Sequence, residues 1–282
     1  MPDISAQDVA ALRKATGAGM MDCKQALESS EGDLDAAMDW LRAKGLGKAG
    51  KLGEREATEG AVEALVDGNV GVIVEVNCNT DFVAKGADFT GTVAALGKLV
   101  AVNGDTDIMA LPFEGSTVGE TLQQLAAKLG ENVALGRVVR FETGADGVLD
   151  AYKHIQNDRG TIGVLVELGG VAAGNSDAQA VAHEIALHVS FAAPGYLTRE
   201  EVPDAVLERE RAVIEEKSRN EGVPEAKLQG AVQGRLNAFY RDVVLLEQPS
   251  VRDPKVTIGK LVESLGANAS VRRFARVKVG ED

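Results

Sequence analysis

Short amphipathic runs separated by helix breakers fill the beginning of the chain. Ser5 stands in a helix-cap position before a first run, a second run opens at Met20, and a third follows Asp33. The stretches TGAG and SSEGD interrupt the runs, as glycine-containing helix ends do. This pattern predicts a small, independent three-helix module over residues 1–45.

The composition then changes to a stretch with little to bury. AKGLGKAGKLGERE, which begins at residue 43, is rich in Gly and Lys. Such a segment is typical of a linker between folded units. We place this linker at residues 46–60.

The rest of the chain contains an internal repeat. GVIVEV at 71–76 is echoed 92 positions later by GVLVEL at 163–168, and in each copy a turn precedes and a helical stretch follows. A second echo pairs TVGETLQQLAAKLGENVALGRVVRF at 117–141 with TIGKLVESLGANASVRRFARV at 257–277. The repeat predicts an α+β core of two related subdomains. The first subdomain comprises residues 61–146. The second comprises residues 147–198 together with residues 248–282.

The second copy contains about 48 additional residues, which are charged and helix-prone and are broken once, at NEGVPE. Apolar residues recur at helical spacing on both sides of the break: Val202, Val206, Val213 and Ile214 before it, and Leu228, Val232, Leu236, Phe239 and Val243 after it. We therefore expect residues 199–247 to form an antiparallel helical hairpin inserted into the second subdomain.

Charge and cysteine content narrow the classes of function. A net charge of −13 and a pI near 4.8 disfavour a protein that grips nucleic-acid phosphates. Cys23 and Cys78 have no metal-site or disulfide-framework spacing, which favours a reducing compartment. The chain has neither an apolar run long enough to cross a membrane nor a signal-peptide pattern, so we expect a cytoplasmic protein. The basic stretch RRFARVK at 272–278 alternates with apolar residues and predicts an edge or solvent-facing strand.

The sequence contains little that indicates covalent chemistry. TGAGMMDCK and LGKAGK both lack the Gly-Lys-Ser/Thr ending of a phosphate-binding loop. His183 and His188 are five positions apart on a predicted helix and therefore point about 140° away from each other, which is poor for chelating one metal. We expect no cofactor, no bound metal and no enzymatic activity. The rival hypothesis is an enzyme that uses Asp81 with one of these histidines.

Two local features have both a structural and a functional interpretation. Asp81 and Phe82 follow the first core strand, where either Phe82 packs back onto the core behind a Thr80 or Asp81 cap, or the pair is presented for binding. Met20 and Met21 open a helix, where one interpretation has one of them filling the core of the bundle and the other has them offering an adaptable contact surface. Both interpretations hold if one methionine lies inside and the other outside. The residues alone favour the structural interpretation of each.

Several long motifs closely resemble the bacterial elongation factor Ts family. The resemblance rests on TGAGMMDCKQAL near the N-terminus, EVNCNTDFVAK after the first core strand, KLGEN at 128–132, AHEIALHVSFAAP, and EQPSVRDPKVTIG. The resemblance extends over nearly the whole chain, and the motifs occur in the same order as in the family. The family implies a guanine-nucleotide exchange factor for elongation factor Tu, with no covalent chemistry. It also implies an N-terminal module similar to ubiquitin-associated three-helix domains.

The resemblance assigns roles to particular residues. It implies that Thr80, Asp81, Phe82 and Val83 enter the GTPase near its nucleotide and Mg²⁺ site. Arg13, Met20 and Met21 would dock the N-terminal module, and His183 and His188 would line a contact face of the second subdomain. The hairpin would contact either a second factor, in a homodimer or 2:2 complex, or the GTPase.

One feature departs from the family pattern. Many members continue past the last core strand into a C-terminal helical module, whereas this sequence stops at RVKVGED, so we expect that contact to be absent. The alternative to an exchange factor is a non-exchange binding module that uses the N-terminal helices. That alternative does not account for the duplicated core or for the TDFV stretch.

Overall fold

A computed structural model describes residues 4–16, 20–38, 40–41 and 57–281. The N-terminal part contains α1 (Ala6–Thr16), α2 (Met20–Ser29) and a helical segment at 34–38 and 40–41. Ser5 Oγ accepts a hydrogen bond from Asp8 N (3.2 Å), which caps α1 as predicted. Asp33 Oδ1 likewise accepts from the amides of Asp35 and Ala36, both at 2.9 Å. The predicted helix starts at Ser5 and Asp33 are therefore confirmed.

Leucine, alanine and cysteine side chains fill the core of this three-helix unit. Its buried members are Leu12, Cys23, Ala26, Leu27, Ala37 and Leu41. Met20 and Met21 are not among them, so the interpretation in which one of these methionines fills the bundle core is wrong. Most of the predicted linker, residues 46–60, lies outside the described residues, and its last two residues already belong to a strand that begins at Glu59.

The first core subdomain is an antiparallel sheet covered by helices on one face. Its elements are β1 (Glu59–Asp67), β2 (Val70–Cys78), α4 (Asp81–Ala84), α5 (Ala87–Asn103), the 3₁₀ turn η1 (Ile108–Ala110), β3 (Pro112–Phe113), β4 (Ser116–Thr117), α6 (Val118–Leu129) and β5 (Val133–Glu142). Three of these strands form the sheet in the order β1-β2-β5, and β3 pairs with β4 in a separate two-stranded sheet. β2, which contains the GVIVEV run, is the central strand, and it is buried along most of its length.

The second core subdomain has the same plan with an insertion. Its elements are β6 (Gly147–Gln156), β7 (Arg159–Gly169), α7 (Ser176–Ala192), η2 (Arg199–Glu201), α8 (Asp204–Asn220), α9 (Glu225–Val243), η3 (Leu245–Glu247), α10 (Ile258–Glu263) and β8 (Ser270–Lys278). The order is β6-β7-β8, so β7, which contains GVLVEL, is again central. Each copy thus consists of a hairpin, covering helices and a third strand beside the second. The protein is an α+β protein.

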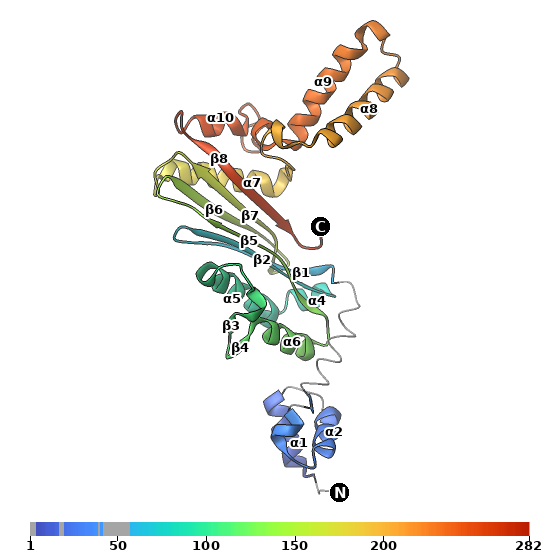
Figure 1. The fold of residues 1–282 in the computed structure, drawn as a ribbon, viewed down its shortest axis with the longest axis vertical. Coiled ribbons are helices and arrows are strands. Elements are labelled where there is room, and N and C mark those ends of the chain that lie inside the picture. The colour runs from blue at the N-terminus through green and yellow to red at the C-terminus, as the bar shows by residue number, and fades with distance from the viewer. Residues whose placement is uncertain (1–3, 17–19, 39, 42–56, 282) are drawn as a thin grey trace.

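The two sheets pack face to face between their helices. Figure 1 shows both sheets between α7 on one side and α5 with α6 on the other. The shared interface buries Val62, Ala64, Ile73, Phe141, Leu149, Leu165 and Val277. Gly163 makes the close approach possible, because a Cβ there would lie 2.6 Å from Val62 Cγ1 and 2.9 Å from Ile73 Cγ2.

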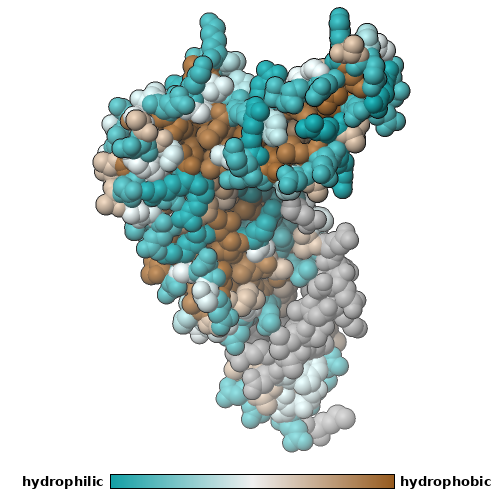
Figure 2. Space-filling model, turned by 45° about the horizontal axis from the view of Figure 1, so that its top comes forward, coloured by the Kyte–Doolittle hydropathy of each residue, from teal (hydrophilic) through white to brown (hydrophobic). Residues whose placement is uncertain are grey.

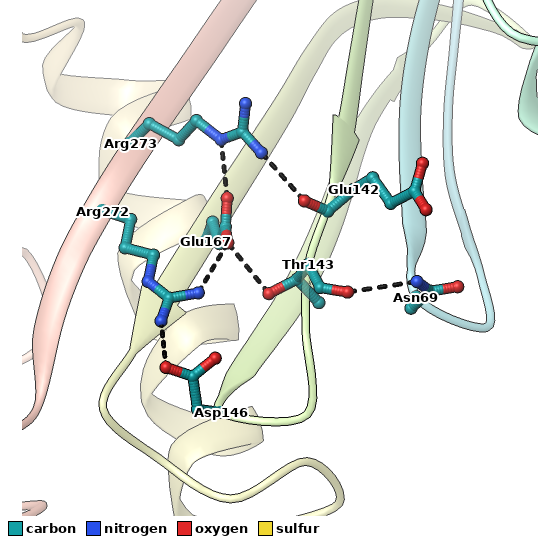
Figure 3. A network of polar contacts seen from close by, with 7 residues as sticks. All are labelled: Asn69, Glu142, Thr143, Asp146, Glu167, Arg272 and Arg273. Atoms are coloured by element: carbon teal, nitrogen blue, oxygen red, sulfur yellow. Dashed lines mark hydrogen bonds and ion pairs between the residues drawn. The ribbon is translucent and has the colours of Figure 1, made fainter.

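A buried carboxylate ties the two subdomains together at one edge (Figure 3). Glu167 on β7 is 3% exposed and accepts hydrogen bonds from Thr143 Oγ1 (2.9 Å), Arg272 Nη1 (3.2 Å) and Arg273 Nε (2.6 Å). Arg273 Nη2 also donates to the carbonyl of Glu142 at the end of β5 (3.1 Å). β8 is an edge strand, as predicted for the basic stretch. Its Arg272 and Arg273, however, form hydrogen bonds where the two subdomains meet.

α8 and α9 pack against each other and project from the second subdomain (Figure 1). Their contact buries Ile214, Leu228, Val232 and Leu236, whereas Val213 is exposed despite its place in the apolar pattern. The surface of this pair is largely hydrophilic around a narrow hydrophobic band (Figure 2). At its base, Val243 O accepts from the amides of Gly195 (3.0 Å) and Tyr196 (3.1 Å), and Arg199 forms an ion pair with Glu247.

Candidate functional site

The loop after β2 presents two side chains outward and holds the next two inward. Thr80 caps the short helix α4, because its Oγ1 accepts a hydrogen bond from Val83 N (3.3 Å). Phe82 is 75% exposed, so the interpretation in which it packs back onto the core is wrong. Val83 and Ala84 are buried in the first subdomain's core. The loop is therefore anchored by residues 83 and 84 and displays residues 81 and 82.

Asp81 and Phe82 form one exposed unit with Lys85. The Asp81 side chain is 63% exposed, and its Oδ2 lies 3.4 Å from Lys85 Nζ. The same ammonium lies 5.6 Å from the centre of the Phe82 ring. A shallow hollow of about 220 Å³, lined by Phe82, Gly86, Phe89, Leu129 and neighbouring residues, adjoins the ring. The loop thus offers a carboxylate and an apolar ring side by side.

Glu131, to which the sequence pattern assigns no role, holds this loop in place through hydrogen bonds with Thr80. Glu131 follows α6, which ends at Gly130 in the left-handed region (φ 73°). Its carboxylate accepts from Thr80 Oγ1 (2.6 Å) and from Thr80 N (3.0 Å). KLGEN at 128–132 marked the family resemblance, but nothing in its spacing indicated a contact with a residue 51 positions earlier.

The predicted docking residues of the N-terminal unit are all on its surface. Arg13 is exposed, and Met20 and Met21 are 60% and 74% exposed. Two adjacent exposed methionines at a helix start form a polarisable apolar patch that adapts to irregular partners. This placement fits the contact surface expected of them.

The structure separates the two histidines of α7. His183 is about half exposed, and its Nδ1 lies 3.0 Å from Asp150 Oδ2, while Gln179 Nε2 donates to Asp150 Oδ1 (3.0 Å). Burial raises the pKa of Asp150, an effect that the hydrogen bonds from His183 and Gln179 partly oppose. Of the two histidines, His183 alone lies on a surface where a partner could reach it.

His188 lies in the core, and the structure therefore does not place it on the contact face expected for it. It is 1% exposed and accepts a hydrogen bond from Val251 N at Nδ1 (3.3 Å). Its Nε2 must then donate to Gln248 Oε1, 2.8 Å away. Burial lowers the pKa of His188, which favours this neutral form.

The described residues contain no cluster of three or more His, Cys, Asp or Glu side chains arranged to hold a metal ion. Among the same residues, no helix combines the length and apolar character needed to span a bilayer. Cys23 and Cys78 are both buried as free thiols. Burial, which is the largest influence, raises the pKa of the Cys78 thiol to about 12, so this thiol is not a ready nucleophile.

The fold and the site define a class: two-subdomain α+β proteins that carry an exposed Asp–Phe pair on a braced loop. Comparison with known proteins identifies the family. A family model described as Elongation factor TS matches residues 79–281. The chain belongs to the elongation factor Ts family, whose members are translation elongation factors.

Three curated relatives match along their whole length. Elongation factor Ts of Micrococcus luteus is 42% identical over 285 residues, covering 99% of this chain and 100% of the relative. The Saccharopolyspora erythraea protein of the same name is 43% identical over 286 residues, and that of Corynebacterium diphtheriae is 41% identical over 286. Both of these alignments cover all of each chain.

Proposed function

We propose that this protein binds elongation factor Tu in its GDP-bound form and promotes GDP release, so that GTP can bind next. The observation that carries the proposal is the exposure of Phe82, which is 75% accessible on a loop whose neighbouring residues are fixed. A large apolar side chain held in solvent, beside a carboxylate, suits insertion into another protein. Membership of the elongation factor Ts family supports the identity of that partner.

Phe82 acts as an apolar wedge that displaces helices of the GTPase near its nucleotide. Asp81 disturbs the polar network around the partner's Mg²⁺ and phosphates. Mg²⁺ demands near-ideal octahedral oxygen ligation, so small displacements of its surroundings weaken its binding. Loss of the metal leaves the diphosphate charge less neutralised, and GDP then dissociates faster.

The exchange makes and breaks no covalent bond and works through linked binding. If the factor weakens GDP binding by a given ratio, GDP weakens factor binding by the same ratio. The product is a nucleotide-free complex of the two proteins, which GTP then resolves. The protein therefore accelerates exchange without being an enzyme in the covalent sense.

Four of the predicted site residues divide into two roles in this mechanism. Asp81 and Phe82 enter the partner, whereas Thr80 and Val83 hold the loop, because Thr80 caps α4 and Val83 packs into the core. The N-terminal unit serves as a ubiquitin-associated-like docking module through Arg13, Met20 and Met21. His183 contributes to a contact face on the second subdomain.

The setting of this function is the cytoplasm, where translation takes place. The partner is a protein, and the net charge of −13 disfavours direct binding to nucleic acid. The pair formed by α8 and α9 provides a further surface, either toward a second copy in a homodimer or 2:2 complex or toward the GTPase.

The test is the release of a fluorescent GDP analogue from the cognate elongation factor Tu at fixed Mg²⁺. Wild-type protein should accelerate release, and Phe82→Ala should remove most of the acceleration. Phe191→Ala is the matched control, because Phe191 is 83% exposed on α7 and undergoes the same chemical change. Demonstrable binding of wild type without acceleration would favour the alternative, a non-exchange binding module that docks through the N-terminal helices.

A further inference from the structure

We propose that Glu131 is a positioning residue for the exchange loop, defined as residues 79–85. Its carboxylate fixes Thr80, so that Asp81 and Phe82 meet the partner in one orientation. This inference rests on the proposed exchange function and adds to it a residue outside the TDFV stretch.

The Glu131 contact occupies both hydrogen-bonding groups that Thr80 can donate. Oε1 of Glu131 lies 2.6 Å from Thr80 Oγ1, and Oε2 lies 3.0 Å from Thr80 N. Hydrogen bonds to an ionised acceptor are shorter and stronger than neutral ones, and two of them also fix direction. The same Thr80 Oγ1 accepts from Val83 N, so the brace and the cap of α4 share one atom.

The loop needs such a brace because its displayed residues have little packing of their own. Phe82 is 75% exposed, and α4 spans only four residues, far too few for a helix to be stable by itself. The orientation of the Phe82 ring therefore depends on how the backbone is held at Thr80 and at the buried Val83 and Ala84. Small errors in the placement of an acting group can reduce a rate by large factors.

Glu131 can be removed without removing the segment that carries it. Asn132 N donates to Asn79 Oδ1 (2.8 Å), and Lys128 Nζ lies 2.7 Å from Asp88 Oδ2. These two contacts keep residues 128–132 beside the loop in a Glu131 variant. We therefore expect Glu131→Ala to fold and to lose the tether on Thr80 alone.

The kinetic test compares Glu131→Ala and Glu131→Gln with wild type in the GDP-release assay. We expect the maximal release rate at saturating factor to fall about tenfold in Glu131→Ala, with the half-saturating factor concentration changed less than about threefold. The rate of Glu131→Gln should lie between those of wild type and Glu131→Ala. The two Thr80 donors bond to different oxygens of Glu131, and glutamine replaces one of these oxygens with an NH₂ group that donates instead of accepting. Glu263→Ala, an exposed acid on α10, is the control and should behave as wild type.

A second readout does not depend on exchange activity. Hydrogen–deuterium exchange of the peptide over residues 79–86 should be about tenfold faster in Glu131→Ala, with β2 and α5 unchanged. A wild-type rate in Glu131→Ala, together with a slow Phe82→Ala, would overturn the positioning role and leave the exchange function intact. If wild type itself fails to accelerate GDP release, the exchange function fails. The role of Glu131 in exchange fails with it, and the deuteration result then decides only whether Glu131 fixes the loop, since unchanged protection of the loop overturns that as well.

Discussion

Phe82 and Val83 are adjacent in sequence but make opposite contributions to the folded state. Phe82 is 75% exposed, whereas Val83 packs among Val76, Phe89 and other members of the first subdomain's core. An exposed ring contributes little to the factor's own stability, but it offers a large apolar area for burial against a partner. The loop thus exposes Phe82 for contact with a partner, while the neighbouring Val83 anchors the loop to the core.

This separation predicts different stability effects for neighbouring substitutions. Phe82→Ala should change the free energy of unfolding by less than about 0.5 kcal/mol, as exposed substitutions usually do. Val83→Ala should lower it by about 1–3 kcal/mol through lost burial and a small cavity. Urea denaturation of the two variants measures both values. A large loss in Phe82→Ala would mean that the ring supports the fold.

Glu167 makes part of the stability of the fold dependent on pH. Burial tends to raise its pKa, but the hydrogen bonds from Arg273, Thr143 and Arg272 outweigh burial and hold the pKa below its ordinary value of 4.5. A carboxyl group whose pKa is lower when folded stabilises the protein above about pH 4.5. That contribution is lost as the pH falls through the folded pKa.

We therefore expect Glu167→Gln to lower the free energy of unfolding by about 1.5–3 kcal/mol at pH 7. The difference from wild type should begin to shrink as the pH falls below about 4.5, because Glu167 of the unfolded wild-type chain then takes up a proton. It should shrink further as the pH falls through the lower pKa of Glu167 in the folded state. Denaturant unfolding at pH 7 and at pH 3.5 gives the comparison. A difference that is constant across this range would show that the carboxylate charge is not what matters.

At the scale of elements, the α8–α9 pair is firmly attached at its base. Arg199 forms an ion pair with Glu247, donates to Asn237 Oδ1 (3.3 Å) and lies 4.3 Å from the centre of the Tyr240 ring. Backbone hydrogen bonds from residues 195 and 196 to Val243 O join the same region. The two helices therefore have a fixed direction relative to the second sheet.

Arg199→Ala should loosen this attachment without unfolding the core. Losing about 1.4 kcal/mol of local stability corresponds to about tenfold faster amide exchange in a segment that opens locally. We expect that increase near residues 195–204 and 237–247, with β6 to β8 unchanged. Arg209→Ala, an exposed arginine on α8, is the control. Equal exchange in both variants would show that the backbone contacts alone fix the base.

At the scale of the whole molecule, the two sheets depend on a position that cannot carry a side chain. Gly163→Ala would place a methyl group 2.6 Å from Val62 Cγ1, so we expect a loss of about 1–3 kcal/mol. A second change, Val62→Ala, should recover part of that loss by making room. Gly230→Ala in α9 meets nothing within 4 Å and should instead gain up to about 1 kcal/mol. Chemical denaturation should be measured for Gly163→Ala, Val62→Ala, the double variant with both changes, and Gly230→Ala. Additive effects of the Gly163 and Val62 changes in the double variant would contradict the close packing.

The sequence reveals features of the fold that depend on local pattern. The caps at Ser5, Asp33 and Thr80 and the central strands β2 and β7 follow from residue type and periodicity. Contacts between distant segments do not follow from residue type or periodicity. The Glu131–Thr80 contact spans 51 positions and the Glu167–Arg273 contact spans 106, and no periodicity encodes either. His188 is buried because residues 248–251, about 60 positions later, cover its face of α7.

The insertion of α8 and α9 between α7 and β8 has a consequence for the order in which a new chain folds. β1, β2 and β5 are all available once residue 142 has been made, whereas β7 waits for its partner β8 until residue 278. At ordinary rates of synthesis that interval is on the order of ten seconds, during which one edge of β7 has no neighbour. The α8–α9 pair relies on local contacts and can form meanwhile. We therefore expect nascent chains to hold a finished first subdomain and an open second one, a state in which chaperone binding would be most useful.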